Sequence, residues 1–502
     1  MIQQIDYFLI APPLVLALAA GLVLLLDAFL PARPRTRTGL GAATLAGILI
    51  SLGFVIAQAS SGGGSPRSTF CVPPALAGGQ AQSAALCSFV VDGFTLVFAG
   101  MVLAAAVVIV LMSMTELAGG AIPVGEWYFL LLCTLVGAVT LPASRDLIML
   151  VVALELVSLP VFALTALKRY DGRSSEAAVK LFVVSVVSTA IMLFGVSLLY
   201  GIAGSVYLSR LGQVFGAPGS DLPAVVTVGV VLVAAGFAFK IAAVPFHSWA
   251  ADVYQGAPIP VAALLSVISK AAGFAGLILV LVSALFGQSG TWTPIVAIVS
   301  ALTMTVGNLL AMRQRSAVRL LAWSSVAQSG YILAPLAVAA TTPGAVGTST
   351  AYLVIYAAMN LGAFAVVMLV SRTTARNELD DYRGLALRRP AAGITLAFCL
   401  VCLAGLPPGL AGLFAKVFVF REIVEGGAGW LAVVMAVNTV IGLYYYAVWT
   451  GRLFTPAGRA EPSLHRPPAT AWVAVGLALA AAVLFSIAPQ LVLDMTSLSA
   501  SG

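Results

Sequence analysis

The chain has 502 residues, of which 61% are apolar and only 9% are charged, whereas about a quarter of the residues of an ordinary soluble domain carry a charge. This composition excludes a soluble globular protein, whose surface needs more charge, and a disordered chain, which has far fewer apolar residues. The formal net charge of +7 comes from arginines scattered through short connectors, which excludes the basic face of a nucleic-acid-binding protein.

Apolar runs of about 20 residues, the length that crosses a bilayer, recur along the whole chain. The first run is long enough to span and no small-residue cleavage site follows it, so we expect no cleavable signal peptide. The sequence predicts an all-α polytopic membrane protein with about fourteen transmembrane helices. We expect them at residues 8–30, 40–60, 90–112, 126–143, 146–167, 176–201, 222–249, 258–285, 292–312, 319–340, 349–371, 391–420, 430–450 and 470–494.

The connectors between these spans differ strongly in positive charge. An even number of spans places both termini on one side, so the connectors fall into two sets. One set holds seventeen Lys and Arg residues, and the other holds only Arg67, Arg145, Arg210 and Arg421. Because Lys and Arg mark cytoplasmic connectors, we predict that both termini lie on the outer side of the membrane.

Two connectors are long enough to hold structure of their own. The outer connector 61–88 carries Cys71 and Cys87, which could pair on the oxidising side or remain free thiols, since spacing alone does not decide. The inner connector 372–390 is charged. It predicts a surface loop that could include a short lateral helix against the head groups.

Four of the five lysines of the chain fall inside expected spans, namely Lys180, Lys240, Lys270 and Lys416. A lysine at mid-span costs about 2.5–3.5 kcal/mol on insertion scales, so we expect compensation. Glu155 is the one carboxylate expected at comparable depth. Burial disfavours a charged amine and a nearby carboxylate favours it, so this set predicts coupled proton-exchanging sites. Lys180 could instead reach the cytoplasmic interface, because it lies one turn from Glu176.

Prolines interrupt two of the lysine-bearing spans. Pro245 deprives the carbonyl of Ile241 of its helical partner. The Pro407-Pro408 pair does the same to the carbonyls of Leu403 and Ala404. Interrupted helices at membrane depth line buried or hydrated cavities, and matching interruptions in two halves indicate an inverted repeat.

The interruptions divide the chain into four expected parts. A three-helix segment at residues 1–125 precedes two inverted five-helix repeats. The repeats occupy residues 126–285, which hold helices 4–8, and residues 286–450, which hold helices 9–13. Helix 14 follows within residues 451–502. Lys240 and Lys416 would then have matching positions in the two repeats.

Uncharged polar residues extend the set of buried lysines. They are Ser266, four residues before Lys270, with Ser324, Ser325, Gln328 and Tyr331 along one face of the tenth span and Thr305 and Asn308 on the ninth. These side chains could hold a track of water or could simply form interhelical hydrogen bonds. His247 beside Trp249 could anchor the interface or help proton uptake.

The chain offers few ligands for a cofactor. It has only two histidines, His247 and His465, and its Cys399-x-x-Cys402 pair lies in an apolar run. It contains no dinucleotide fingerprint and no cysteine cluster. We therefore expect no flavin, iron–sulfur cluster, haem or metal in this chain.

Several stretches resemble the antiporter-like subunits of respiratory complex I, the proton-translocating NADH-quinone oxidoreductase, and most closely the N-type subunits of bacteria. They are residues 155–160, 240–249, 252–260 with 269–270, 324–331 and 405–416. The 252–260 run, and a lysine instead of a glutamate at position 416, resemble the N type and not the M type. The resemblance covers nearly the whole chain.

The resemblance implies a fold and a role for each buried charge. It implies fourteen helices, two inverted repeats and discontinuous helices 7 and 12. Glu155 matches the acid of helix 5 and Lys240 the helix 7 lysine with which it pairs. Lys270 matches the central lysine of helix 8, Lys416 the exit-side lysine of helix 12, and Lys180 a further lysine of helix 6. Many members of the family carry histidine where this chain has Gln328, whose amide cannot titrate.

The same resemblance implies proton export driven by NADH oxidation and quinone reduction in partner subunits, which hold FMN, iron–sulfur clusters and quinone. The partners would be subunit M and the small quinone-proximal subunits of the membrane arm. Two other functions stay open. Related subunits form a multi-subunit sodium/proton antiporter, and a solitary solute carrier would also have broken helices. A purely structural bundle is disfavoured, because it gains nothing from four lysines at lipid depth.

Overall fold

The computed structural model describes residues 5–497 except 32, 62–64, 74–85, 121, 169–170, 218–223, 373, 375–376 and 457–467. His465 and the connector residues Arg169, Arg376, Arg459 and Arg466 lie outside the described residues.

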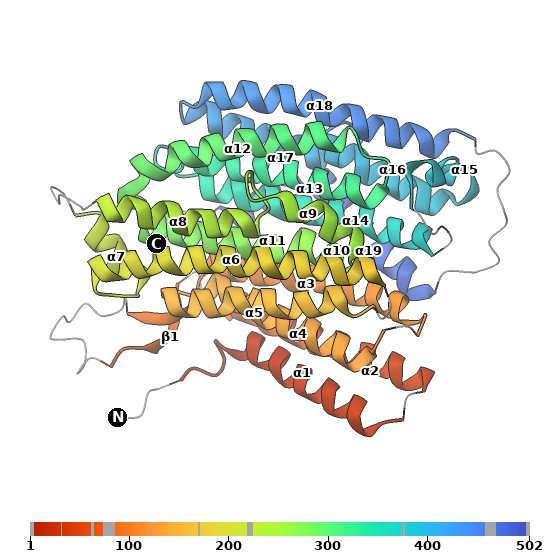
Figure 1. Cartoon of the computed structure of the whole chain (residues 1–502), viewed down its shortest axis with the longest axis horizontal. Coiled ribbons are helices and arrows are strands. Elements are labelled where there is room, and N and C mark those ends of the chain that lie inside the picture. The colour runs from red at the N-terminus through yellow and green to blue at the C-terminus, as the bar shows by residue number, and fades with distance from the viewer. Residues whose placement is uncertain are drawn as a thin grey trace.

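Long helices run side by side along one axis of the molecule (Figure 1). In the described part of the chain, eleven are long and apolar enough to cross a membrane. They are α1 (Ala11–Phe29), α2 (Pro34–Ser61), α3 (Gly93–Leu117), α4 (Val124–Thr140) with the turn after it, α5 (Leu147–Ala166), α6 (Gly172–Ala203), the segment Ile259–Ala284, the segment Phe286–Ala311 that contains α12 (Ser289–Ala311), α14 (Ala345–Ser371), α18 (Gly429–Phe454) and α19 (Ala469–Ile487).

Three expected spans are built from shorter helices. The seventh consists of α8 (Ala224–Lys240) and α9 (Ser248–Gly256), and the twelfth of α16 (Pro390–Ala404) and α17 (Leu410–Glu425). The tenth is α13 (Ala317–Leu333). Both predicted interruptions are therefore present, and the predicted all-α polytopic fold is confirmed. The boundaries of the four parts of the chain stay a prediction.

Some helix ends differ from those expected. α2 begins at Pro34, six residues early, because proline suits the first turn of a helix and the polar residues after it stay outside the apolar layer. The last span ends at Ile487 and a separate helix α20 (Pro489–Thr496) follows, since Pro489 cannot continue the helix. The short helix α7 (Leu208–Phe215) was not predicted, whereas α15 (Leu385–Arg388) lies in the inner connector where a lateral helix was considered.

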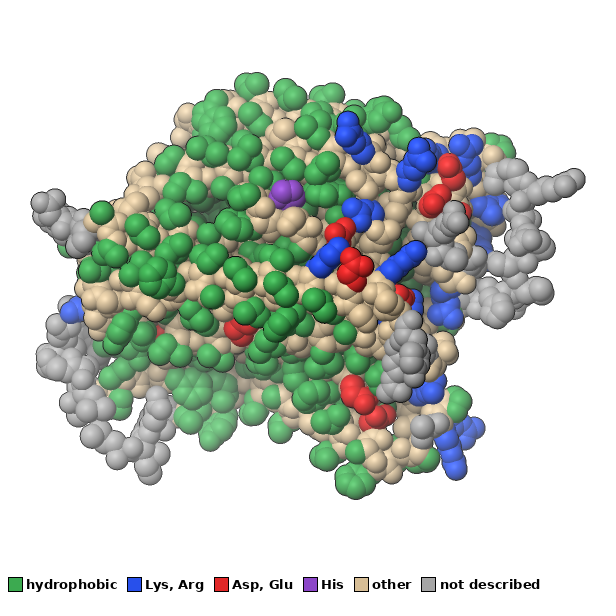
Figure 2. Space-filling model, viewed as in Figure 1, with side chains coloured by type: hydrophobic (Ala, Val, Ile, Leu, Met, Phe, Trp, Pro, Cys, Tyr) green, Lys and Arg blue, Asp and Glu red, His purple; other side chains and the backbone are tan. Residues whose placement is uncertain are grey.

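The centre of the bundle is formed by two spans. Ile259–Ala284 and Ala345–Ser371 are each 94% buried over their most apolar window, whereas α1 and α6 are 22% and 28% buried. Ile259–Ala284 contains α10 (Ile259–Leu264) and α11 (Lys270–Ile278), separated by the π-helical turn Leu265–Ser269. On the face shown in Figure 2, apolar side chains cover most of the middle, and most of the charged ones gather toward one end.

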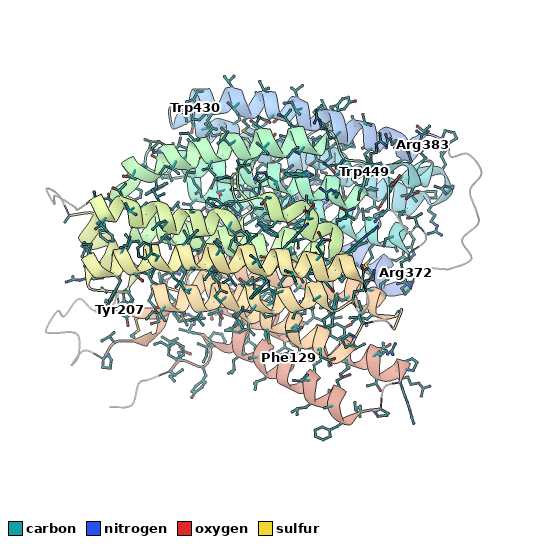
Figure 3. All side chains as sticks on the ribbon, in the orientation of Figure 1. Phe129, Tyr207, Arg372, Arg383, Trp430 and Trp449 are labelled. Atoms are coloured by element: carbon teal, nitrogen blue, oxygen red, sulfur yellow. A yellow bond between two sulfur atoms is a disulfide. The ribbon has the colours of Figure 1, made fainter. Side chains whose placement is uncertain are left out.

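A small β-hairpin marks the other end of the bundle. β1 (Arg67–Cys71) pairs antiparallel with β2 (Cys87–Val91), and the opposed Cys71 and Cys87 form a disulfide. The backbone N–H of Asp6 donates to Thr69 Oγ1 at 3.1 Å, so the start of the described chain lies beside this hairpin. In Figure 3, Arg372 and Arg383 lie at the opposite end from Tyr207.

Alkylation of the unfolded protein tests the cysteine pairing. Without reductant, we expect a thiol reagent to modify the three free cysteines, Cys133, Cys399 and Cys402, and to spare the disulfide-bonded pair. After reduction, all five should react. Intact-mass spectrometry counts the added groups. Modification of Cys71 or Cys87 before reduction would contradict the pairing.

Candidate functional site

Glu155 and Lys240 lie on neighbouring helices. The Glu155 carboxylate, half-buried on α5, accepts a hydrogen bond from Thr189 Oγ1 of α6 at 2.7 Å. Lys240, the last residue of α8, donates from Nζ to Ser158 Oγ, one turn beyond Glu155 on α5. No ion pair within 4.0 Å joins Lys240 to a carboxylate in the described residues. Glu155 and Lys240 are therefore neighbours without a direct contact.

Space between Lys240 and the next lysine is tight. The cavity beside Lys240, which reaches Ser269, has a volume of only about 10 Å³, room for about one water molecule. A Cβ atom on Gly273 would lie 3.1 Å from Cβ of Lys240. Glycine at this position thus lets α11 pack directly against the interrupted seventh span, which brings Lys240 near the helix that Lys270 begins.

Lys270 lies at the centre of the bundle and is 1% exposed. Its Nζ donates to the Ser325 carbonyl at 2.5 Å and to Ser325 Oγ at 2.6 Å, and it lies 5.7 Å from the centre of the Tyr356 ring. The Tyr356 hydroxyl also donates to Ser325 Oγ, at 2.8 Å. Lys270 directly follows the π-helical turn Leu265–Ser269, and such turns occur often at functional sites.

Gln328 connects two tyrosines from other helices. Its Oε1 accepts from the Tyr352 hydroxyl of α14 at 2.7 Å, and its Nε2 donates to the Tyr446 hydroxyl of α18 at 3.4 Å. The Tyr446 and Ser324 hydroxyls are 2.5 Å apart. The Tyr352 ring in turn stacks on Tyr331, with ring centres 6.2 Å apart. On the predicted polar face of the tenth span, Ser324 and Gln328 are thus linked through Tyr446, whereas Ser325 belongs to the contacts of Lys270.

The expected meeting of the ninth and tenth spans takes place at Asn308. Its Nδ2 donates to the Tyr331 hydroxyl and to Asn438 Oδ1, each at 3.2 Å. Its Oδ1 accepts from the Tyr445 hydroxyl at 3.0 Å. Asn438 also donates to Thr305 Oγ1 at 3.1 Å. The predicted contact between the ninth and tenth spans thus also includes Asn438 and Tyr445 of α18.

Lys416 occupies the interruption of the twelfth span. Its Nζ donates to the carbonyls of Leu403 at 3.2 Å and Ala404 at 2.7 Å, the two carbonyls that the prolines were expected to free. It also lies 5.3 Å from the centre of the Tyr331 ring, where a cation is attracted by the ring face. In the seventh span the freed carbonyl of Ile241 accepts from Ser329 Oγ at 2.6 Å.

Lys180 does not join the other four predicted residues. Its side chain is 44% exposed and forms ion pairs with Glu176 at 2.7 Å and Asp252 at 3.1 Å. Asp252 also pairs with Arg319 at 2.8 Å. Partial burial alone would raise the pKa of the Asp252 carboxyl, but hydrogen bonds from Arg319 and Lys180 outweigh it and hold that pKa below its usual value. These residues, which we call the surface cluster, line a cavity of about 330 Å³ together with Arg173, Gln255 and Gly256.

Sequence reasoning missed the tyrosines of α14 and α18. Tyr352, Tyr356 and Asn360 recur every fourth residue along α14 and therefore share one helix face. That spacing was a usable signal, but a tyrosine in an apolar run is ordinarily part of the core. Asn360 donates to Ser266 Oγ at 2.8 Å, so this face continues past Lys270.

No group of three or more His, Cys, Asp or Glu side chains that could hold a metal ion occurs among the described residues. Cys399 and Cys402 are buried free thiols in α16. The chemistry available in the described site is thus that of amines, one carboxylate, hydroxyls and amides. These groups can bind, donate and accept protons.

Comparisons with known proteins place this arrangement in a family. Residues 144–442 match the family described as NADH:quinone oxidoreductase/Mrp antiporter, TM. NADH-quinone oxidoreductase subunit N 2 of Streptomyces griseus is 48% identical over 99% of this chain and 94% of its own length. Subunit N of Salinispora tropica is 44% identical over 90% of this chain and 86% of its own.

Solved structures agree with these relatives. A chain of respiratory complex I from Thermus thermophilus is 29% identical with a TM-score of 0.76, and the match covers 98% of this chain and all of that one. A chain of the Mrp complex from Dietzia has a TM-score of 0.81 at 21% identity, over 97% of each chain, which is a likeness of fold. The chain therefore belongs to the NADH:quinone oxidoreductase/Mrp antiporter transmembrane family, in the group formed by subunit N of NADH-quinone oxidoreductases.

Proposed function

We propose that this chain is a proton-translocating membrane-arm subunit of an NADH:quinone oxidoreductase. NADH oxidation and quinone reduction in partner subunits would drive protons from the cytoplasm to the outside through it. One observation carries the proposal: Lys240, Lys270 and Lys416 are buried at membrane depth and held by neutral oxygens, with no carboxylate within 4.0 Å in the described residues. An amine without a fixed counter-ion can take up and release a proton, which a static ion pair does not do.

We infer a route for the proton from the positions of these groups. Asp252 of the surface cluster lies on α9, beyond the interruption that follows Lys240, so the cluster is the candidate uptake region. Lys240 and Lys270 would exchange protons across Ser269 and a single water. The hydroxyl and amide groups around Gln328 and Tyr331 would lie between Lys270, which contacts Ser325, and Lys416, which lies over the Tyr331 ring. Water would bridge the gap between Ser325 and Gln328, since each of these groups can donate and accept.

Glu155 would control the first lysine. A negative charge nearby favours the protonated form of an amine, and Glu155 lies one turn before Ser158, to which Lys240 donates. A change in the charge or position of Glu155 would therefore release the proton from Lys240 toward Lys270. Direct contact would make this release harder, because breaking a buried ion pair costs more.

The outer location of both termini is part of the proposal. It is supported by the seventeen Lys and Arg residues in one set of connectors against four in the other. The disulfide of the β-hairpin beside Asp6 favours the oxidising side for that end. We propose that FMN, the iron–sulfur clusters and quinone belong to partner subunits. In the membrane arm, the neighbours of this chain would be subunit M and the small quinone-proximal subunits.

At position 180, we expect a positive charge that does not exchange protons to be enough for proton pumping. Lys180→Arg should change NADH-driven proton pumping by no more than about twofold, because exposed ion pairs contribute little and arginine keeps the charge. Pumping is measured with a pH-sensitive dye in vesicles that contain the whole complex. A loss as large as that expected for Lys240→Ala would instead place Lys180 in the relay.

The intact complex tests the function as a whole. Mass spectrometry of the complex purified through this chain should find FMN- and iron–sulfur-containing partners, and vesicles that contain it should acidify on addition of NADH. A sodium/proton antiporter is the second candidate, favoured by the fold shared with the Mrp complex chain. Small antiporter subunits, no flavin and sodium-dependent proton movement without NADH would establish it instead.

A further inference from the structure

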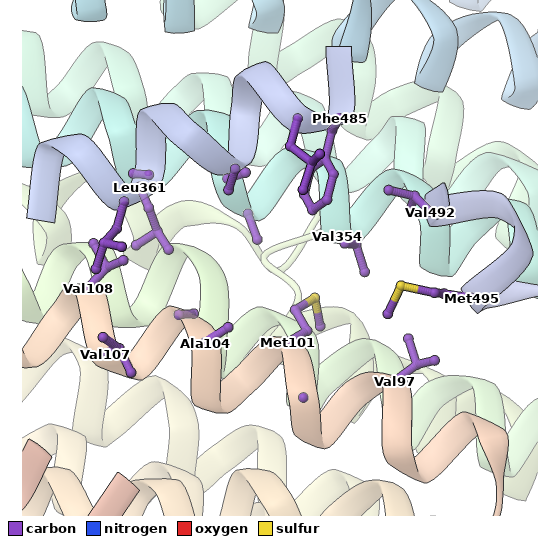
Figure 4. Close-up of a pocket in the computed structure, with 18 of the residues that line it drawn as sticks. Val97, Met101, Ala104, Val107, Val108, Val354, Leu361, Phe485, Val492 and Met495 are labelled. Atoms are coloured by element: carbon purple, nitrogen blue, oxygen red, sulfur yellow. The ribbon is translucent and has the colours of Figure 1, made fainter. Parts of the chain in front are cut away.

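A large apolar cavity lies between α2, α3, α14, α19 and α20 (Figure 4). Its volume is about 580 Å³, and Thr496 is the one polar residue among the described residues that line it. The Thr496 hydroxyl already donates to the Val492 carbonyl at 2.8 Å. Water would find no partners here, and an empty space of this size would leave its walls without dispersion contacts.

The cavity opens to the side of the bundle. At its rim, the side chains of Leu49 on α2 and of Leu491 and Met495 on α20 are exposed. Its floor is formed by buried residues such as Leu361 and Ala478. A ligand would therefore reach it from the apolar layer that surrounds the spanning helices.

The shape of the cavity selects its occupant. It follows α3 from Leu96 to Val108, a length of about 18 Å at the helical rise, close to the apolar depth of one leaflet, about 15 Å. The mean cross-section open to the centre of a water molecule is then about 32 Å². A helix with its side chains is about 10–12 Å across and would enter with only part of one face, whereas an extended hydrocarbon chain fits along the whole length.

We propose that this cavity binds one acyl chain of a phospholipid from the outer leaflet. α3 begins at Gly93, directly after the β-hairpin, so Val97 and Met495 lie toward the hairpin end of the cavity and Val108 lies toward the bilayer centre. The carboxyl end of the acyl chain lies near the first two residues and its methyl end near Val108. The choice of leaflet rests on the orientation proposed above, whereas the direction of the chain in the cavity does not.

The site also contacts a helix of the relay. Val354, Ala357 and Leu361 line the cavity from α14, and Tyr352 and Tyr356 lie on the other face of the same helix. A bound acyl chain thus packs behind the tyrosines that contact Gln328 and Ser325. The acyl chain fills a space beside α14 that would otherwise be empty.

Photocrosslinking of the whole complex tests the site. The probe is phosphatidylethanolamine with a diazirine in one acyl chain, mixed into vesicles of phosphatidylethanolamine and phosphatidylglycerol. With the labelled residues identified individually, a diazirine near the carboxyl end should label Val97 or Met495, and one near the methyl end should label Val108 or Leu361. The reverse order would overturn the proposed chain direction, and no labelling of α3 would overturn the site.

A glycine pair provides the variant and its control. A Cβ atom on Gly100, which lines the cavity, meets nothing within 4 Å, so Gly100→Leu fills the cavity without a clash. We expect about tenfold less crosslinking, the effect of losing burial for about two CH₂ groups. Gly21→Leu on the exposed side of α1, where a Cβ is equally free, should leave it unchanged. Equal crosslinking in both variants, or stronger labelling by a diazirine-bearing isoprenoid quinone, would overturn the phospholipid assignment.

Discussion

Replacing Lys240 by alanine is expected to lower NADH-driven proton pumping by at least about tenfold, because a positioned proton-transfer group contributes about 10²–10⁴-fold. Electron transfer from NADH to a hydrophilic artificial acceptor should remain nearly unchanged, since that reaction takes place in partner subunits. Lys240 is buried and donates to Ser158, one turn beyond Glu155 on α5. Its loss removes the first amine of the proposed route.

Three variants separate proton exchange from charge and from folding. Lys240→Arg keeps a positive charge that does not dissociate, so it should pump as poorly as Lys240→Ala. Glu155→Gln removes the charge that favours protonated Lys240 and should also reduce pumping. Lys168→Ala is the matched control, because Lys168 is a half-exposed lysine paired with Asp171. Full pumping by Lys240→Arg would mean that position 240 needs only a positive charge. That result would contradict the proposed proton exchange at Lys240.

Charged and proline residues made much of the site predictable. A lysine in an apolar run is anomalous by itself, so Lys240, Lys270 and Lys416 could be identified without a structure. The prolines indicated which carbonyls lose their helical partners. The groups that satisfy these carbonyls, Ser329 Oγ and Lys416 Nζ, depend on helix packing and could not be predicted from local pattern.

Other parts needed the tertiary structure. Lys180 has the same sequence signal as the other buried lysines, but the acids Glu176 and Asp252 hold it at the surface. Asp252 is 72 residues further along the chain, so its contact with Lys180 depends on how α6 packs against α9. The tyrosines of α14 and α18 carry no charge and are typical of a core. Their role becomes visible only through the partners of Gln328.

Replacing Gln328 by leucine is expected to reduce proton pumping several-fold while the complex still assembles. Leucine removes the acceptor of the Tyr352 hydroxyl and the donor to the Tyr446 hydroxyl. The Tyr352 hydroxyl is then left without its acceptor, which costs about 1–3 kcal/mol, and the proposed connection between Lys270 and Lys416 loses one of its groups. Pumping and artificial-acceptor activity are measured on the same vesicles, so the ratio of the two isolates the proton step.

Two further variants decide whether the connection itself matters. Gln328→His supplies one donor and one acceptor in the neutral ring, so it should restore most of the pumping that leucine removes. Gln58→Leu is the matched control, because Gln58 is also a buried amide, but on α2, where it donates to the carbonyls of Phe8 and Leu9. An equal loss in the Gln58 variant would assign the effect to stability. Unchanged pumping in Gln328→Leu would show that proton transfer does not need the amide that joins Tyr352 and Tyr446. The route between Lys270 and Lys416 would then not pass through these tyrosines.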